Sequence, residues 1–368
     1  MPVRFNGGYF QDDRHGCRYL EFTSNGNQFL TIENEIMKIV FWMNKGADIV
    51  ELRHKSRDID VMWRNPMPMP VAGTYISPAN PAAGNFFDYY PGGWQTVFPN
   101  AHLATNGYKN APLGTHGEVC LQAWSYEVKE HSNSKLVIDM RVRTGRTPFL
   151  LTRTFTVESG QPSFRLKETI VNEGNEAMHY SYGHHPVFGA PFVQEGCRID
   201  VPDGSIAVVP EQLAANTARY KANQRQAWPY LQTMDGTQAD ASIVLGPSAG
   251  SADSFHVEPS QGWAALRNPN LDLGVGLAWD VQTFPYLWMW QAYCGNPGYP
   301  FYKRNYNVAL EPFSVPAQSL VESIAQGHAQ LLEAGTSTST DLLFMFTSGL
   351  GKITHIDLHG NFQQDRHG

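Results

Sequence analysis

Three consecutive segments alternate apolar and polar residues, and this pattern constrains the fold more than any other feature of the chain. The segments are Lys135–Arg143, Leu151–Val157 and Ser163–Val171. A period of two residues is typical of a half-buried strand, because successive side chains point to opposite faces. The turn-forming segment Glu158–Gln161 separates the second run from the third. We therefore predict three sequential antiparallel strands that form a meander.

Other apolar runs continue the strand pattern, whereas helical patterns are scarce. The later strand candidates are Gly274–Trp279, Tyr286–Gln291 and Val308–Glu311. Short helices are expected only at Ala317–Ala325 and Glu211–Ala218, each of which follows a proline. The sequence thus predicts an all-β protein with few short helices, built as a large antiparallel β-sandwich or barrel. No linker divides the chain, so we expect a single domain over residues 1–368.

Two further segments attract attention. Met67–Gly84 contains four prolines and is preceded by a fifth, Pro66. A loop this long in a compact domain is usually functional. We expect an ordered loop over a site. The segments 10–16 and 362–368 agree at six of seven positions. A repeat architecture needs at least three units, so this similarity predicts no solenoid.

The charge balance excludes several classes of function. Lys and Arg number 27 against 34 Asp and Glu, a formal net charge of −7. This balance predicts no basic surface for nucleic acid or an anionic membrane. No secretory signal and no apolar run of membrane-spanning length is present in the sequence, which predicts a cytoplasmic protein. The four cysteines are far apart and form no Cys-x-x-Cys pair, so we expect them to be reduced and buried.

Polar, aromatic and glycine residues gather in three regions beyond what a core needs. The regions are Tyr90–Asn100 with Leu113–Val119, Tyr180–Gly189, and Leu287–Gln291 with Asn307–Phe313. Glu311 lies in an apolar strand, and a buried glutamate is rare unless it is paired. Burial would raise its pKa toward neutrality, so the residue is either salt-bridged or a functional base.

Histidines and tryptophans accompany this glutamate. His116 and Glu118 are two residues apart and would share one face of a strand. Trp94, Trp288 and Trp290 each fit a hydrophobic core when taken singly. Together with His and Glu they indicate a carbohydrate cleft, because the apolar faces of sugars stack on aromatic rings.

Five short motifs occur in an order and at separations that resemble a known family. They are Gly46–Leu52 in an early strand, Phe98-Pro99-Asn100, His116-Gly117, His185-Pro186-x-Phe188 and Glu311-Pro312. The set is similar to the motifs of the aldose 1-epimerase (galactose mutarotase-like) superfamily, and closest to a divergent branch of it. The resemblance covers about residues 30–335, which leaves extensions at both termini.

The resemblance implies a β-supersandwich and a cofactor-free isomerase. Such an enzyme interconverts the α and β anomers of a free or modified hexose by opening and reclosing the ring. By this resemblance Glu311 is the base for the C1 hydroxyl, His185 is the acid for the ring oxygen, and His116 binds the substrate and stabilises charge at the ring oxygen. The candidates for further sugar contacts are Asn100, Trp94, Asp280, Trp290, Gln291 and Glu118. The expected partner is a small-molecule sugar, and the protein is expected to be a monomer or homodimer.

The sequence also departs from the family pattern and leaves two alternatives open. Ala101 stands where the family has an arginine after Pro-Asn, and Val187 replaces the tyrosine of His-Pro-Tyr-Phe. One alternative is a non-catalytic carbohydrate-binding or sensing protein on the same scaffold. The other is a metal-dependent sugar isomerase or lyase, with the ligands His116, Glu118, His185 and Glu311. His184 is expected to be structural, because in an extended strand it points away from His185.

Overall fold

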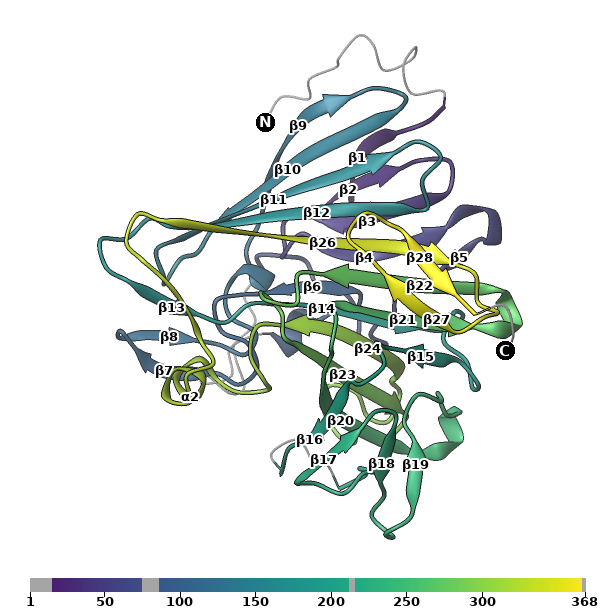
Figure 1. Ribbon diagram of the computed structural model, residues 1–368. Coiled ribbons are helices and arrows are strands. Elements are labelled where there is room, and N and C mark those ends of the chain that lie inside the picture. Colours follow the sequence, from purple (N-terminus) through teal and green to yellow (C-terminus); the bar gives the residue numbers. More distant parts are fainter. Residues whose placement is uncertain (1–14, 75–85, 212–215, 366–368) are drawn as a thin grey trace.

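Two large antiparallel sheets face each other and form a sandwich (Figure 1). The structure, a computed structural model, describes residues 15–74, 86–211 and 216–365. Within these residues the first sheet has twelve strands. In pairing order they are β1 (Arg18–Ser24), β2 (Asn27–Glu33), β3 (Met37–Trp42), β4 (Asp48–His54), β6 (Trp94–Val97), β14 (Gly183–Gly189), β24 (Tyr306–Phe313), β23 (Tyr286–Tyr293), β20 (Ser251–Glu258), β16 (Ile206–Val209) and β17 (Gln224–Ala227), with β5 (Ile59–Asp60) beside β4.

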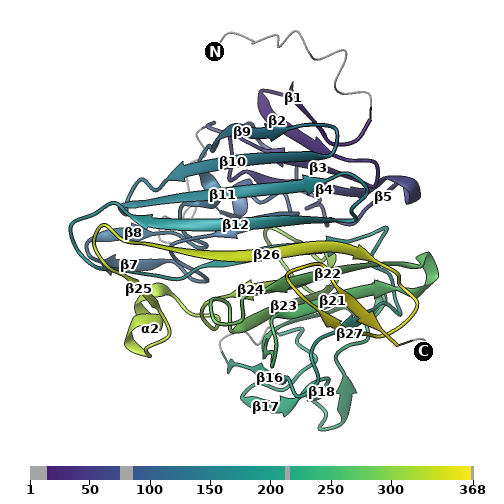
Figure 2. The ribbon, with the colours of Figure 1, turned by 45° about the horizontal axis from the view of Figure 1, so that its top comes forward.

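The second sheet contains the predicted meander. Its eight strands pair in the order β15 (Arg198–Asp200), β21 (Trp263–Asn268), β22 (Leu273–Trp279), β26 (Ser337–Thr347), β12 (Ser163–Asn172), β11 (Phe149–Glu158), β10 (Lys135–Arg143) and β9 (Ser125–His131). Figure 2 shows β9 to β12 and β26 side by side in this order. The alternating runs of the sequence thus become strands whose successive residues are buried and less buried in turn.

The apolar faces of the two sheets meet in one shared core. Phe41 on β3 packs edge-on against Phe155 on β11, with 5.1 Å between the ring centroids. Trp94 on β6 meets Phe344 on β26 in the same layer, at 6.3 Å. Each fully buried side chain of this kind stabilises the fold by about 1.5–3 kcal/mol. The structure therefore confirms the predicted all-β, antiparallel sandwich.

Smaller elements surround the sandwich. In the described part of the chain, four two-stranded sheets pair β7 (Thr105–Tyr108) with β8 (Ala111–Leu113), β13 (Met178–Tyr180) with β25 (Gln330–Leu332), β18 (Tyr230–Gln232) with β19 (Gln238–Asp240), and β27 (Ile353–Ile356) with β28 (Phe362–Gln364). Single 3-10 turns are η1 (Lys55–Arg57), η2 (Phe87–Tyr89), η3 (Val119–Leu121), η5 (Pro247–Ala249) and η6 (Pro269–Leu271).

One predicted helix is present in shortened form. Helix α2 spans Leu320–Ala325 and begins after Ser319, whose hydroxyl accepts the backbone N–H of Glu322. Glu322 reaches back to the Ser319 backbone and completes a capping box. This cap explains why the helix starts three residues later than the predicted Ala317. The second predicted helix, Glu211–Ala218, includes residues 212–215, which lie outside the described residues.

Parts of two segments singled out in the sequence fall outside the described residues. Residues 75–84 of the proline-rich stretch lie outside them, as do residues 10–14 and 366–368 of the near-repeat. The four cysteines form no disulfide among the described residues; Cys17, Cys120 and Cys197 are buried, while Cys294 is half-buried. In the part of the chain that the structure describes, no helix has the length and apolar character to span a membrane.

Candidate active site

The pairing register of two central strands brings His185 and Glu311 together. Strand β14 pairs with β24 so that Gly183 lies opposite Phe313 and Val187 opposite Ala309. The midpoint of this register places His185 directly across from Glu311. The distance from His185 Nε2 to Glu311 Oε2 is 3.6 Å, slightly longer than a hydrogen bond. The two residues that the motifs singled out, 126 positions apart in the chain, therefore form one pair on the outer face of the first sheet.

His116 joins this pair from a turn. Its backbone is left-handed, with a φ of 60°, and Gly117 follows with a φ of 78°. The N–H of Glu118 then donates to the Phe98 carbonyl at 2.8 Å. The turn directs the His116 ring to the His185 ring, with the centroids 5.3 Å apart and the planes nearly perpendicular. The prediction that His116 and Glu118 share the face of a strand is wrong, because a left-handed turn separates them.

Glu118 instead holds a neighbouring loop. Its carboxylate accepts the backbone N–H groups of Gly145 and Arg146 at 2.9 and 2.7 Å and the hydroxyl of Thr147 at 2.9 Å. These bonds occupy the side chain away from His185, so Glu118 has a structural role. Among the described residues, no three His, Cys, Asp or Glu side chains are grouped to hold a metal ion. The proposed metal set of His116, Glu118, His185 and Glu311 is therefore not assembled.

Aromatic side chains enclose the cluster. The Tyr90 ring lies 5.7 Å from the His185 ring, and the Trp290 ring lies 6.5 Å from it. Trp63 and Phe301 continue the wall at 5.8 and 5.2 Å from Trp290. Trp290 was expected at the site from the sequence. The others come from loops whose position no local pattern reveals, although the aromatic content of residues 86–94 marks one of those loops.

Two of the predicted sugar contacts lie on the opposite face of the first sheet, toward the interior. The Trp94 indole N–H donates to His184 Nδ1 at 3.2 Å, and its ring meets Phe344 in the core. Gln291 is two residues after the core residue Met289 on the same strand, so the two side chains face the same side of the sheet. The Gln291 side-chain amide donates to the Ala241 carbonyl at 2.7 Å. Adjacent residues of a strand face opposite ways, so Trp290 reaches the site and Gln291 does not.

The remaining two predicted contacts stabilise loops. Asn100 donates to the carbonyls of Leu103 and Gly114 at 2.7 and 2.8 Å and accepts the Leu320 N–H. All of its hydrogen-bonding groups are thus used within the protein. Asp280 accepts the Gln282 N–H and the Thr283 hydroxyl in a tight turn. Asn and Asp residues are common in such local roles, and neither residue contacts His185.

The sequence analysis missed a buried ion pair close to this cluster. Lys45 and Asp48 are 1% and 0% exposed, and the Lys45 ammonium donates to Asp48 Oδ2. Gln95 lies across from His185 in the β6–β14 register and donates to the same carboxylate at 3.4 Å. Burial raises the pKa of Asp48 to about 6, even though Lys45 opposes the shift. Gln95 thus connects the buried pair to the strand of His185.

Burial also sets the protonation of the central residues. Desolvation raises the pKa of Glu311 well above its ordinary value of 4.5. The same effect lowers the pKa of His185 to about 4 and that of His116 well below 6.5. Near neutral pH both imidazoles are therefore uncharged, and Glu311 retains its proton more strongly than an exposed glutamate does. Neighbouring groups whose pKa values are shifted in opposite directions are candidates for the acid and base of a reaction.

A second polar network lies directly beneath, between the two sheets. Glu168 accepts Arg153 Nε at 2.7 Å through one oxygen. The other carboxylate oxygen is 2.7 Å from His184 Nε2 and accepts the Tyr182 hydroxyl. All four residues are buried. His184 therefore has the structural role expected from the sequence, and it anchors the strand that presents His185.

The turn at Gly117 gives a first testable prediction. A Cβ at Gly117 would lie 2.3 Å from the Phe98 carbonyl oxygen, whereas one at Gly160 would meet nothing within 4 Å. Both residues have a positive φ. We expect Gly160→Ala to lower the free energy of unfolding by about 1–2 kcal/mol and Gly117→Ala to lower it by about 1–3 kcal/mol more. Urea denaturation measures both, and equal losses would show that the turn accommodates a side chain.

The fold is shared with solved structures at low sequence identity. The structure of a proposed aldose 1-epimerase from Klebsiella pneumoniae subsp. pneumoniae MGH 78578 matches with a TM-score of 0.71 and 16% identity, over 91% of this chain and 88% of that chain. A galactose mutarotase-like protein from Clostridium acetobutylicum has a TM-score of 0.61 and 12% identity, over 90% of this chain and 99% of that one. A galactose mutarotase related enzyme from Lactobacillus acidophilus has a TM-score of 0.58 and 18% identity, over 91% and 100%.

Sequence comparison identifies the family. No curated protein matches the chain significantly in sequence. A family model described as Domain of unknown function (DUF4432) matches residues 24–345. The chain therefore belongs to the DUF4432 family, and its β-sandwich has the galactose mutarotase-like fold.

Proposed function

We propose that the chain is a cofactor-free aldose 1-epimerase that interconverts the α and β anomers of a hexose. The observation that carries the proposal is the buried pair of His185 and Glu311, 3.6 Å apart with oppositely shifted pKa values. The aromatic wall of Tyr90, Trp63 and Trp290 supports a sugar as the ligand. The protein is further proposed to act on a free sugar in the cytoplasm, as a monomer or homodimer.

The pair supplies both proton transfers of ring opening. One member takes the proton of the C1 hydroxyl while the other gives a proton to the ring oxygen. The bond from C1 to the ring oxygen then breaks, and C1 becomes an aldehyde carbon. Rotation about the C1–C2 bond presents the other face, and the reverse transfers close the ring. By family resemblance Glu311 is the base and His185 the acid, and His116 stabilises charge at the ring oxygen.

Proton counting shows why this pair suits the reaction. Opening and closure each leave the pair with as many protons as it had at the start, because one is taken up and one is given back. The pair therefore needs one proton in total, wherever that proton resides. Burial favours the neutral distribution, in which Glu311 holds the proton, over an ion pair. In that distribution Glu311 is the member that can give a proton and His185 the member that can take one, so the roles implied by the family resemblance apply once the proton has moved to His185. Interacting groups of this kind titrate as a unit.

A bell-shaped pH dependence follows from this count. A second proton enters as the pH falls through about 4, the lowered pKa of His185, and activity is lost there. The single proton leaves as the pH rises through the pKa of Glu311, which lies well above 4.5, and activity is lost again. The rate of anomer exchange measured from pH 3 to 10 is expected to show both limbs. A rate independent of pH over that range would contradict the pair mechanism.

Polarimetry of freshly dissolved sugars tests the proposal itself. We expect the protein to accelerate mutarotation of at least one aldose from a panel of hexoses, uronic acids and sulfonated sugars, and to do so equally after treatment with a chelator. Loss of activity with the chelator, restored by a metal, would favour the isomerase or lyase alternative instead. Saturable sugar binding without any acceleration would favour the sensing alternative.

A further inference from the structure

A hollow of about 320 Å³ lies over strands β1 to β4 of the first sheet, beside the His185 cluster. Its lining is formed by Phe22, Phe29, Val40, Val50, Glu51, Arg64, Asn65, Met67, Met69 and Pro91. The floor is apolar: Phe22 and Phe29 are cross-strand partners whose rings stack at 4.9 Å with planes 16° apart. The Phe22 side chain is nevertheless 41% exposed. A flat aromatic surface is thus open to a ligand.

The segment around Met67 and Met69 crosses the outer face of the sheet and forms one wall of the hollow. Asn27 on β2 donates to the Pro70 carbonyl at 3.1 Å and accepts the Ala72 N–H at 2.8 Å. These two bonds tie the segment after Met69 to the outer face of the sheet. The position of this wall is therefore set by hydrogen bonds within the protein.

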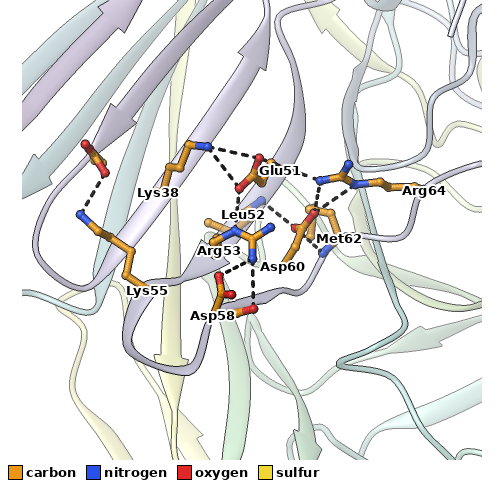
Figure 3. A network of polar contacts seen from close by, with 10 residues as sticks. Lys38, Glu51, Leu52, Arg53, Lys55, Asp58, Asp60, Met62 and Arg64 are labelled. Atoms are coloured by element: carbon orange, nitrogen blue, oxygen red, sulfur yellow. Dashed lines mark hydrogen bonds and ion pairs between the residues drawn. The ribbon is translucent and has the colours of Figure 1, made fainter.

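Two charged side chains at the rim, Glu51 and Arg64, lie 3.9 Å apart, and each contacts further charged neighbours (Figure 3). Glu51 lies 3.4 Å from Lys38 Nζ and accepts Arg53 Nε at 2.7 Å. Arg64 donates to one oxygen of Asp60 through Nε and Nη2, at 3.2 and 2.7 Å. Within the described residues, no hydrogen bond involves Arg64 Nη1. The rim therefore offers a positioned N–H donor and a carboxylate acceptor, and each charge already has a counter-charge.

A narrow ribbon of chain separates the hollow from the His185 cluster. The backbone N–H of Asn65 donates to the Pro91 carbonyl and that of Gly93 to the Trp63 carbonyl. Trp63 belongs to the wall beside Trp290, whereas Arg64, Asn65 and Pro91 line the hollow. Only β6 lies between β4, which carries Glu51, and β14, which carries His185. Strands are about 5 Å apart, so the two places are neighbours on one face.

We propose that this hollow is a second sugar subsite, which binds an uncharged pyranose unit beyond the unit that reaches His185 and Glu311. A pyranose has an apolar face that fits the Phe22 ring and a rim of hydroxyls that match Arg64 and Glu51 as donor and acceptor. The balanced charges disfavour a charged unit. The volume lies at the lower end for ligand sites, about 300–1,000 Å³, and suits one ring. The inference rests on the proposed function for the place of the first unit.

Titration of reducing disaccharides against their monosaccharides tests the subsite. Maltose, cellobiose, lactose and melibiose are compared with glucose and galactose, with the dissociation constants measured by NMR line broadening. We expect at least one disaccharide to bind about tenfold more tightly than its monosaccharide. Phe22→Ala and Arg64→Ala are expected to remove that preference and leave monosaccharide binding unchanged.

Leu20→Ala is the matched control. Leu20 lies on the same strand as Phe22, is similarly exposed at 46%, and does not line the hollow. It should retain the disaccharide preference. The subsite is contradicted if no disaccharide binds more tightly than its monosaccharide, or if both hollow variants retain the preference. The test measures binding and not anomer exchange, so the subsite and the proposed function can fail independently. A protein that prefers the disaccharide without accelerating anomer exchange has the subsite and lacks the activity.

Discussion

Replacement of Glu311 by glutamine is expected to slow catalysed anomer exchange by about 10²–10⁴-fold, the usual contribution of a general acid or base. Glutamine retains the shape of the side chain but neither takes nor gives a proton at ordinary pH. Glu311 is 3% exposed, and this burial disfavours its charged form and raises its pKa. The substitution should therefore preserve the fold, and sugar binding measured by NMR should persist.

Glu258→Gln provides the control for that experiment. Glu258 ends strand β20 of the same sheet and is held by Arg225 on the protein surface, with a distance of 2.5 Å to Arg225 Nη2. Its loss should leave the exchange rate within about twofold of the wild-type rate, because its charged partners among the described residues are Arg225 and His256, which lie outside the His185 cluster. If Glu311→Gln accelerates exchange of the same sugar as much as the wild-type protein and has the same melting temperature, Glu311 is not the acid or base of the reaction.

Glu168→Ala should have the largest effect on stability. It would leave the Arg153 guanidinium, 3% exposed, without its carboxylate. Breaking a buried pair in this way costs about 3–5 kcal/mol of unfolding free energy. Glu173→Ala is the matched control, because the Arg143–Glu173 pair has side chains 67% and 37% exposed, and such pairs contribute about 0–1 kcal/mol. Urea denaturation of both variants at pH 7 measures the difference.

The pH dependence of stability gives a second readout for Glu168. His184 and Arg153 hold the pKa of this carboxyl well below its usual range despite its burial. A lowered folded-state pKa stabilises the protein above the unfolded-state pKa, and the contribution is lost as the pH falls toward the folded-state value. Wild-type stability should thus decrease below about pH 4.3, the pKa of an unfolded glutamate, and the variant should show less of this decrease. Equal costs for Glu168→Ala and Glu173→Ala would contradict the structural role of the network.

Strand periodicity made much of the fold predictable from the sequence. Lys135–Arg143 was predicted and observed with the same limits, because its alternation is unbroken and its ends are polar. The helix was predicted to begin at Ala317, but Ser319 is its N-cap and an N-cap residue has a non-helical backbone. Helix α2 therefore begins only at Leu320. The partners of each strand were not predictable. Neighbours such as β14 and β24 are more than 100 residues apart, so their pairing depends on the global fold.

The candidate site was predictable only where a motif fixed a strand position. Three site residues lie together because each occupies a strand position whose side chain faces the outer side of the first sheet: His185, Glu311 and Trp290. Trp94 and Gln291 were misplaced because a composition argument does not state which way a strand faces. Glu118 was misplaced because the left-handed turn at His116 reverses the expected parity. The buried pair of Lys45 and Asp48 carries no sequence signal, since its burial depends on strands far along the chain.

Exchange spectroscopy by NMR, at equilibrium and near neutral pH, tests the central claim most directly. The method measures α to β exchange of each sugar in the presence of wild type, His185→Ala and Glu311→Gln. The account predicts exchange with the wild-type protein for at least one hexose, at a rate well above that in buffer, and exchange at the buffer rate with both variants. Buffer-rate exchange for every sugar with the wild-type protein, or equal acceleration by all three proteins, would contradict it.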